Sequence, residues 1–172
     1  MITGLKREQT GFSMIEVLIT MVLICIGVLG MMALQGRTIQ YTQDAVQRNV
    51  AAGLAIELVE MMRARPEGLP GTSGFLKGAN ADFPAKPDKC TPLPDDTEDQ
   101  LGCWAAKAAQ VLPGDSELMK SEYHVCRSKT RGNCTNDGDA IEIRIAWRVR
   151  AGECEVQGGD ATVCSYTLRT QL

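Results

Sequence analysis

An unbroken apolar run begins close to the N-terminus of the chain. Residues 1–11 are polar, and the 20 residues from Val17 to Gly36 carry no charge. A helix of 20 residues is ~30 Å long, which matches the hydrocarbon core of a bilayer. The pattern therefore predicts one membrane-spanning helix segment over residues 12–36.

Apolar side chains continue at helical spacing beyond this run. Those that fall within one arc of a 3.6-residue helix are Val50, Leu54, Leu58 and Met61. Pro66 and Gly68 then stop the helix. Residues 37–65 are expected to form an amphipathic half of the same long helix, with its apolar stripe packed on a folded domain.

The remaining residues, 66–172, have the pattern of a small α+β domain. Residues 66–99 are rich in Pro, Gly and Asp, which indicates a loop. A short helix is expected over residues 100–112, with Thr97 and Gln100 at capping-box spacing. Three strands are expected at residues 122–126, 140–150 and 162–170, and their connections of about a dozen residues permit an antiparallel meander.

The middle strand has the clearest alternation. Its apolar positions are Ile141, Ile143, Ile145, Trp147 and Val149. Its charged positions are Glu142, Arg144, Arg148 and Arg150. Because neighbouring side chains of a strand point to opposite faces, the apolar set is expected in the core and the charged set in solvent.

Seven cysteines change the picture of this domain. Cys25 lies in the apolar run, and the others are Cys90, Cys103, Cys126, Cys134, Cys154 and Cys164. Six cysteines in a small polar domain suggest three disulfides in an oxidising compartment. Zinc is the alternative, but there is no C-x-x-C pair and His124 is the one histidine, so no metal site is expected.

The spacing of these cysteines favours pairing between neighbours. Cys126 and Cys134 bracket the first expected hairpin, and Cys154 and Cys164 bracket the second. Cys90 and Cys103 then remain for the third bridge, and Cys25 is expected to stay a free thiol.

Charge and motif content argue against several functions. The formal net charge is -3, with 18 basic and 21 acidic residues and no dense basic run. This balance does not support nucleic-acid binding. We find no nucleophile motif, glycine-rich phosphate loop or metal-ligand cluster, so neither catalysis nor a cofactor nor a small-molecule substrate is expected.

Two independent features agree on the topology of the chain. Lys6 and Arg7 precede the apolar run and are expected to stay in the cytoplasm. The chain beyond Arg37 would then be exported, as the cysteines also suggest. A removed secretory signal peptide is an alternative, but its apolar region is usually about 7–15 residues long.

Glu16 is a lone carboxylate at the edge of the apolar run. A carboxylate at the bilayer centre costs about 2.5–3.5 kcal/mol on insertion scales, which implies a partner. One interpretation places Glu16 at the interface, solvated by headgroups. In the other, cleavage between Gly11 and Phe12 creates an α-amine at Phe12, with which Glu16 pairs in its own chain or in a neighbour.

The string G-F-S-M-I-E-V-L, preceded by a short basic leader, closely resembles the class III leader of type IV prepilins. In that family a prepilin peptidase cuts after the glycine and methylates the new N-terminus. The resemblance implies a cut between Gly11 and Phe12, N-methylation of Phe12, and a role for Glu16 in assembly and register. Many major pilins have a proline within the membrane helix, and this chain has none there.

The second half resembles the PilV-type minor pilins in its M-M-R-A-R-P string, its Cys–Trp helix and its Ile-rich strand. The resemblance implies a disulfide-stapled type IV pilin fold and a structural role in pilus initiation and the tip complex, supporting twitching motility and adhesion. The implied partners are other minor pilins and the major pilin. The implied location is the inner membrane, with a periplasmic C-terminal domain, and then the pilus fibre. A minor pseudopilin of a type II secretion system is the alternative.

Overall fold

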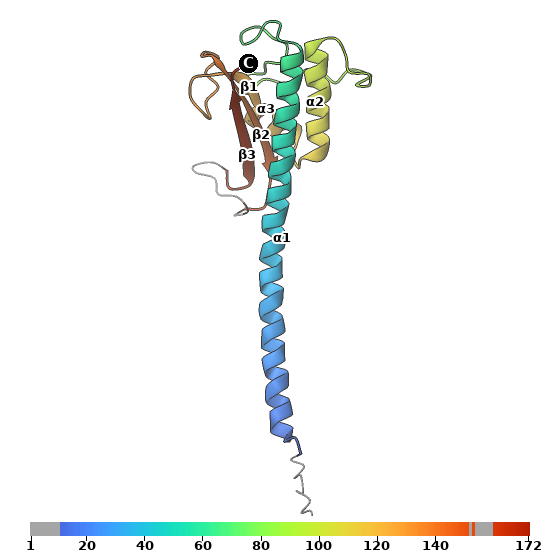
Figure 1. Ribbon diagram of the computed structural model, residues 1–172, viewed down its shortest axis with the longest axis vertical. Coiled ribbons are helices and arrows are strands. Elements are labelled where there is room, and N and C mark those ends of the chain that lie inside the picture. Colours follow the sequence, from blue (N-terminus) through green and yellow to red (C-terminus); the bar gives the residue numbers. More distant parts are fainter. Residues whose placement is uncertain (1–10, 152, 154–159) are drawn as a thin grey trace, which may run out of the picture. The chain divides into compact units, whose positions relative to one another are not determined.

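Three helices and three strands make up the part of the chain that the structure describes, residues 11–151, 153 and 160–172 of a computed structural model. They are α1 (Met14–Ala64), α2 (Thr97–Val111), α3 (Ser116–Glu122), β1 (His124–Ser128), β2 (Ala140–Arg148) and β3 (Val163–Thr170) (Figure 1). The chain divides into two compact units, the second being Tyr41–Leu172. The expected α+β fold is confirmed.

The second unit is built around one antiparallel sheet in the order β1-β2-β3. Within this unit the C-terminal part of α1 lies beside α2, and the two helices run in opposite directions (Figure 1). Their buried side chains join those of the sheet in one core. Trp104 of α2 is buried, and its indole Nε1 donates a hydrogen bond to the carbonyl oxygen of Leu54 in α1 at 2.9 Å. The largest fully buried apolar side chains are Trp147, Phe75, Leu58, Met62, Leu101, Ile141, Ile143 and Ile145.

The apolar stripe of α1 lies where the sequence pattern places it. Leu54 and Leu58 are buried, while Asn49 and Glu60 on the opposite side are exposed. The helix ends at Ala64, one residue before the expected end and two before Pro66. The sequence signal is strong here because amphipathic periodicity and a helix-stopping residue coincide.

The expected capping box of α2 is wrong. Asp96 is the N-cap, and its Oδ1 accepts hydrogen bonds from the backbone N–H groups of Glu98 at 2.9 Å and Asp99 at 3.1 Å. The Gln100 side chain instead donates to the carbonyl oxygen of Pro94 at 2.7 Å. An aspartate one residue earlier is at least as good an N-cap as threonine, so the helix begins at Thr97.

The first strand lies two residues later in the chain than expected. α3 occupies Ser116–Glu122, capped by Asp115, whose Oδ1 accepts from the N–H of Leu118 at 2.7 Å. β1 therefore begins at His124 rather than at residue 122. β2 ends at Arg148, two residues before the expected end. A helix of 7 residues is too short to give a periodic signal, which explains why it was not expected.

Disulfides hold the long loops of the second unit. The structure joins Cys90 to Cys103, with a Cα–Cα distance of 5.7 Å, and Cys126 to Cys134, at 5.8 Å. These are two of the local pairs that the spacing favours. Cys164 is also disulfide-bonded, whereas its expected partner Cys154 lies outside the described residues.

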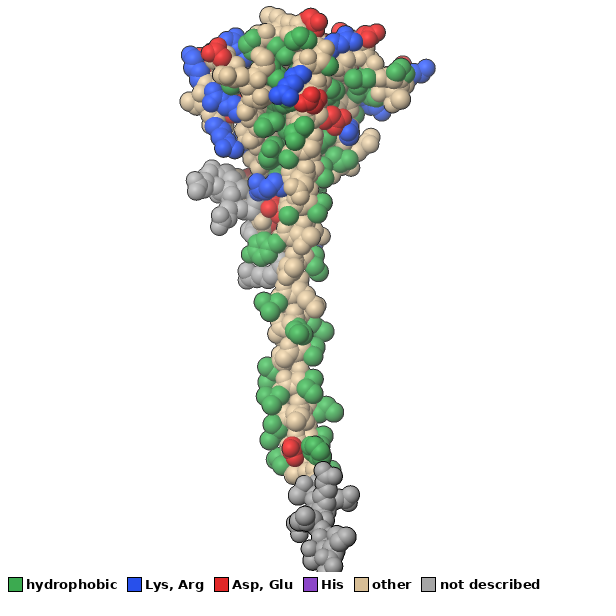
Figure 2. Space-filling view, in the orientation of Figure 1, with side chains coloured by type: hydrophobic (Ala, Val, Ile, Leu, Met, Phe, Trp, Pro, Cys, Tyr) green, Lys and Arg blue, Asp and Glu red, His purple; other side chains and the backbone are tan. Residues whose placement is uncertain are grey.

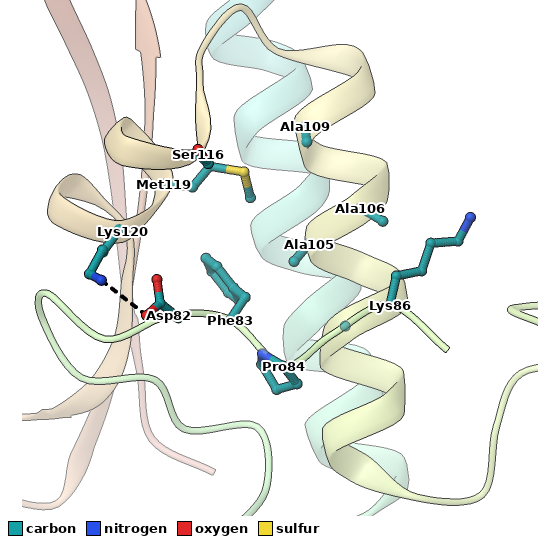
Figure 3. Close-up of a pocket in the computed structure, with 11 residues that line it drawn as sticks. Asp82, Phe83, Pro84, Lys86, Ala105, Ala106, Ala109, Ser116, Met119 and Lys120 are labelled. Carbon is teal, nitrogen blue, oxygen red and sulfur yellow. Dashed lines mark hydrogen bonds and ion pairs between the residues drawn. The ribbon is translucent and has the colours of Figure 1, made fainter. Parts of the chain in front are cut away.

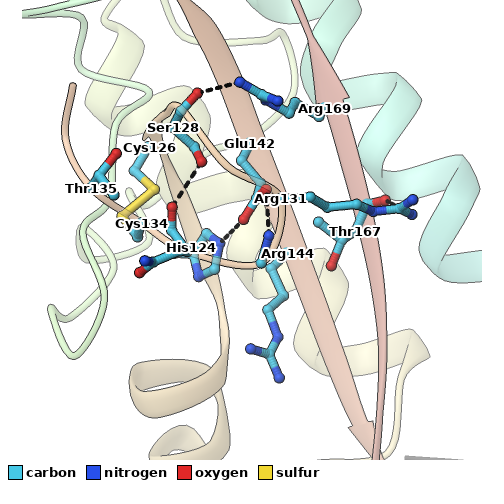
Figure 4. Close-up of polar contacts among 12 residues, drawn as sticks. His124, Cys126, Ser128, Arg131, Cys134, Thr135, Glu142, Arg144, Thr167 and Arg169 are labelled. Carbon is cyan, nitrogen blue, oxygen red and sulfur yellow. Dashed lines mark hydrogen bonds and ion pairs between the residues drawn. A yellow bond between two sulfur atoms is a disulfide. The ribbon is translucent and has the colours of Figure 1, made fainter. Parts of the chain in front are cut away.

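The expectation that Glu142 faces solvent is wrong. Glu142 is fully buried, as is its cross-strand partner Cys126. The β1–β2 connection folds back over this face of the sheet, and the N–H of Gly132 donates to Glu142 Oε2 at 2.8 Å (Figure 4). The alternation of β2 predicts two faces correctly, but a connection that returns over one of them leaves no local signature in the sequence.

A buried lysine joins the loop before α2 to the first strand. The backbone N–H groups of Lys77 and Val125 each donate to the carbonyl oxygen of the other residue at 2.8 Å. The Lys77 ammonium donates to the carbonyl oxygens of Tyr123 at 2.6 Å, Lys120 at 3.0 Å and Gly78 at 3.3 Å. Burial lowers the pKa of Lys77 to about 8, and the nearby Asp82 carboxylate opposes this shift only in part.

Because of this lysine, the free energy of unfolding should change with pH in the alkaline range. Above about pH 8 the folded protein loses the Lys77 proton, while the unfolded chain keeps it until about pH 10.5. The unfolded state then binds more protons, so the free energy of unfolding rises, by about 1–2 kcal/mol between about pH 8 and about pH 9.5. Lys77→Met should lack this rise.

The measurement is denaturant unfolding of full-length protein in detergent, followed by tryptophan fluorescence. Both tryptophans, Trp104 and Trp147, are buried in the second unit, so the signal reports on that unit. Lys107→Met is the matched control because Lys107 is an exposed lysine that pairs with Glu57. A rise that persists in Lys77→Met would contradict the assignment.

Candidate functional site

The backbone around Gly11 and Phe12 precedes the first helix. Residues 11–13 have no regular secondary structure, and α1 begins at Met14. The carbonyl oxygen of Ser13 accepts the first helical hydrogen bonds, from Glu16 at 3.0 Å and Val17 at 3.4 Å. Phe12 is 83% exposed. The peptide bond between Gly11 and Phe12 therefore lies in accessible, non-helical backbone, the form in which a peptide bond can enter a protease active site.

Glu16 occupies the first turn of α1, and it is exposed. A carboxylate in the first turn interacts favourably with the positive end of the helix dipole, worth typically about 0.3–1 kcal/mol. No ion-pair partner for Glu16 is found among residues 11–151, 153 and 160–172, and the expected leader cations Lys6 and Arg7 lie outside the described residues. Phe12 and Glu16 are one helical turn apart in sequence.

The stretch after Glu16 presents apolar side chains all around the helix. Val17, Leu23 and Leu34 are representative, with exposed fractions of 46%, 62% and 71%. Figure 2 shows hydrophobic side chains along this part of α1. By length and composition α1 can cross a membrane. Cys25, within this stretch, is a free and exposed cysteine.

The second unit carries a shallow cavity of about 290 Å³ between α2, α3 and the loop at residues 82–86 (Figure 3). Phe83, Ala105 and Met119 form its apolar floor. At its edge the Lys120 ammonium pairs with an Asp82 oxygen at 3.0 Å. Within the described part of the chain, no three His, Cys, Asp or Glu side chains converge as ligands for a metal ion.

The polar groups that sequence reasoning missed are Lys77 and the buried pair of His124 and Glu142, whose Nε2 and Oε1 atoms are 3.0 Å apart. Lys77 lies in a loop, and His124 and Glu142 lie on strands, at positions where a polar side chain is expected to face solvent. Their burial depends on segments distant in sequence, so no local signal identifies them.

One family description matches this chain, and it covers residues 6–32. It is the prokaryotic N-terminal methylation motif. The match includes Gly11, Phe12 and Glu16 and most of the uncharged stretch. Neither the curated proteins nor the solved structures contain a match to the chain.

The matched motif indicates a type IV pilin-like or pseudopilin protein. Such a leader implies processing by a prepilin peptidase and a membrane context, and it suggests a structural protein rather than an enzyme. The apolar N-terminal helix fits inner-membrane anchoring of a pilin. The second unit adds a disulfide-stapled α+β fold to this picture.

Proposed function

We propose that this chain is a minor pilin of the type IV pilus, with a structural role in pilus initiation and the tip complex, and through it in twitching motility and surface adhesion. Residues 1–11 are the leader, 12–36 span the inner membrane, 37–65 continue the helix, and 66–172 form the periplasmic domain. The carrying observation is Gly11–Phe12 in non-helical backbone, followed four residues later by Glu16 at the edge of the uncharged stretch of α1.

The accessible backbone before α1 supports leader removal. Cleavage after Gly11 by a prepilin peptidase leaves Phe12 as the first residue, and N-methylation keeps its amine basic. The new cation lies next to the apolar segment, where a charge is costly unless it has a partner. The chain therefore gains a basic group four residues from Glu16, the lone carboxylate of residues 12–36.

The exposure of Glu16 supports a partner outside the described chain. Burying it unpaired in a bilayer costs about 2.5–3.5 kcal/mol on insertion scales. Pairing with its own Phe12 amine is possible in a single subunit. When helices stack in a fibre, the amine of an adjacent subunit can take this position, which fixes the axial register between neighbours.

Two features favour a minor pilin over a major subunit. The segment 12–36 has no proline, and the domain has long individual loops pinned by disulfides, as at Cys90–Cys103. Its partners would be other minor pilins and the major pilin. A minor pseudopilin of a type II secretion system shares the same leader, and recovery of the chain from surface fibres separates the two functions.

Leader processing is the first expected outcome. The mature chain should begin at N-methyl-Phe12, detected by mass spectrometry of the N-terminal peptide. Gly11→Val should block cleavage, since a β-branched side chain fills a position that the peptidase recognises as glycine, and the precursor should accumulate. Gly4→Val is the matched control within the leader and should be processed normally. A mature start after about residue 30, typical of a secretory signal peptide, would refute the assignment.

Glu16 is expected to act in assembly rather than in insertion. Glu16→Ala and Glu16→Gln should leave membrane insertion and cleavage largely intact, because both remove a charge from an apolar helix. Incorporation into pili should fall at least about tenfold, since losing one partner of a buried ion pair costs about 3–5 kcal/mol. The measurement is the amount in sheared pili divided by the amount in membranes.

Thr20→Ala serves as the control for this measurement. Thr20 lies one turn further along α1 and is also exposed, and its hydroxyl donates to the Val17 carbonyl oxygen at 2.9 Å. This variant should enter pili at the wild-type ratio. If both Glu16 variants also do so, Glu16 is only an interfacial residue and the register mechanism is wrong.

A further inference from the structure

The β1–β2 connection, residues 129–139, forms a strap across the outer face of the sheet. The Cys126–Cys134 disulfide ties its middle to β1. At Gly132 the backbone has a φ of +82°, in the left-handed region that glycine adopts without strain, and its N–H donates to Glu142 Oε2 at 2.8 Å. The strap is thus held by one covalent bond and by a hydrogen bond to a buried carboxylate.

Further polar contacts hold the strap at its middle and at both ends. The Ser128 hydroxyl donates to the carbonyl oxygen of Asn133 at 2.8 Å, and Arg127 Nε donates to that of Gly138 at 3.0 Å. Arg169 of β3 donates to the carbonyl oxygen of Ser128 at 2.7 Å (Figure 4) and to that of Lys129 at 2.8 Å. The strap is therefore held by side chains from both β1 and β3.

Beneath the strap lies a buried imidazole–carboxylate pair. His124 is 5% exposed and Glu142 is 0% exposed. His124 Nε2 is 3.0 Å from Glu142 Oε1, while the other carboxylate oxygen accepts the Gly132 N–H. Glu142 Oε2 therefore accepts a backbone N–H, and Oε1 lies within hydrogen-bond distance of an imidazole nitrogen.

Charged groups on β2 itself and on two other segments surround this pair. Arg144 on β2 pairs with Glu122 of α3 at 2.8 Å, and Lys77 approaches from the loop before α2. Burial lowers the pKa of His124; the hydrogen bond and charge of Glu142 oppose this, and Arg144 and Lys77 lower it further. Charged strap side chains are engaged elsewhere, since Lys129 pairs with Asp137 at 2.5 Å and Arg131 donates to the Thr167 carbonyl oxygen at 3.5 Å.

We propose that the strap is an acid-sensitive cover, which opens over His124 and Glu142 when the surroundings of the protein become acidic. An imidazolium needs water or anionic partners, and with the strap closed His124 has one carboxylate, Glu142, and two nearby cations, Arg144 and Lys77. Opening admits water, so the open form takes up a proton more readily than the closed form. The disulfide keeps the strap tethered, so opening is local and reversible.

The sign of this effect follows from proton linkage. His124 has a pKa in the closed form below the usual 6.5 of an exposed histidine. Between these two values the open form binds more protons, so the free energy of opening falls as the pH falls below about 6.5. Acidification thus favours a surface with Glu142 uncovered and one added positive charge. This inference rests on the second unit alone and does not depend on the proposed function.

The test is hydrogen exchange of the full-length protein in detergent at about pH 7.5 and about pH 5.5, with rates corrected for the intrinsic pH dependence of exchange. Protection of the strap amides should fall about threefold to tenfold at the lower pH. About tenfold is the upper limit for a single titrating group, because about pH 5.5 is one unit below the ordinary histidine pKa. Amides of α2, residues 97–111, should keep their protection. Equal loss in α2 would mean that the whole unit unfolds, which would overturn the proposal.

His124→Gln provides the decisive variant, since its amide can still donate to Glu142 but does not titrate. Strap protection in this variant should not depend on pH over the same range. The same pH dependence in His124→Gln, or none in the wild type, would overturn the proposal.

If the variant does not fold, NMR of the wild type decides. His124 is the one histidine in the chain, so protein without a polyhistidine tag gives one imidazole titration. Its midpoint should lie below 6.5 and coincide with strap opening. A midpoint at or above 6.5, or a midpoint that does not coincide with the pH at which the strap opens, would refute the proposal.

Discussion

The need to remove the uncharged stretch of α1, residues 17–36, from water constrains the rest of this chain. Large side chains between Val17 and Gly36 are exposed in the structure, and burying each such side chain contributes about 1.5–3 kcal/mol. Only lipid or other apolar helices can supply that burial for so long a stretch. Glu16 lies at the edge of this stretch. In water its carboxylate would simply be solvated, but next to apolar surroundings it needs a partner.

A membrane anchor of this kind is consistent with the disulfides of the second unit. A helix that anchors the chain with its basic leader in the cytoplasm would deliver the second unit to an oxidising compartment. Within the second unit, disulfides support segments with little regular structure of their own. Cys90–Cys103 attaches the loop before α2 to that helix, and Cys126–Cys134 attaches the strap to β1.

Periodic segments could be predicted from the sequence, and segments held by distant contacts could not. α1 and β2 are long, and their apolar positions recur every 3.6 or every 2 residues, so both were expected within one or two residues. α3 is short, and the Asp96 cap competes with a neighbouring threonine, so the helix start and the first strand were misplaced. The burial of Glu142 depends on the strap, which no pattern within β2 can reveal.

The signal for the candidate site is local, whereas much of the signal for the domain is not. Gly11, Phe12 and Glu16 lie within six residues at a boundary between polar and apolar sequence, and the structure shows that boundary as the start of a helix. What these residues do depends on neighbours outside the chain. The membrane-compatible helix and the α+β fold, in contrast, are properties of the chain itself.

Quantitative mass spectrometry of purified surface fibres tests the central claim most directly. Labelled reference peptides from the second unit would measure this chain against the main fibre subunit, in cells that express it at its natural level. The account predicts that the chain is present as a minor component and begins at N-methyl-Phe12. A processed chain found in the membrane fraction but absent from the fibres would contradict it.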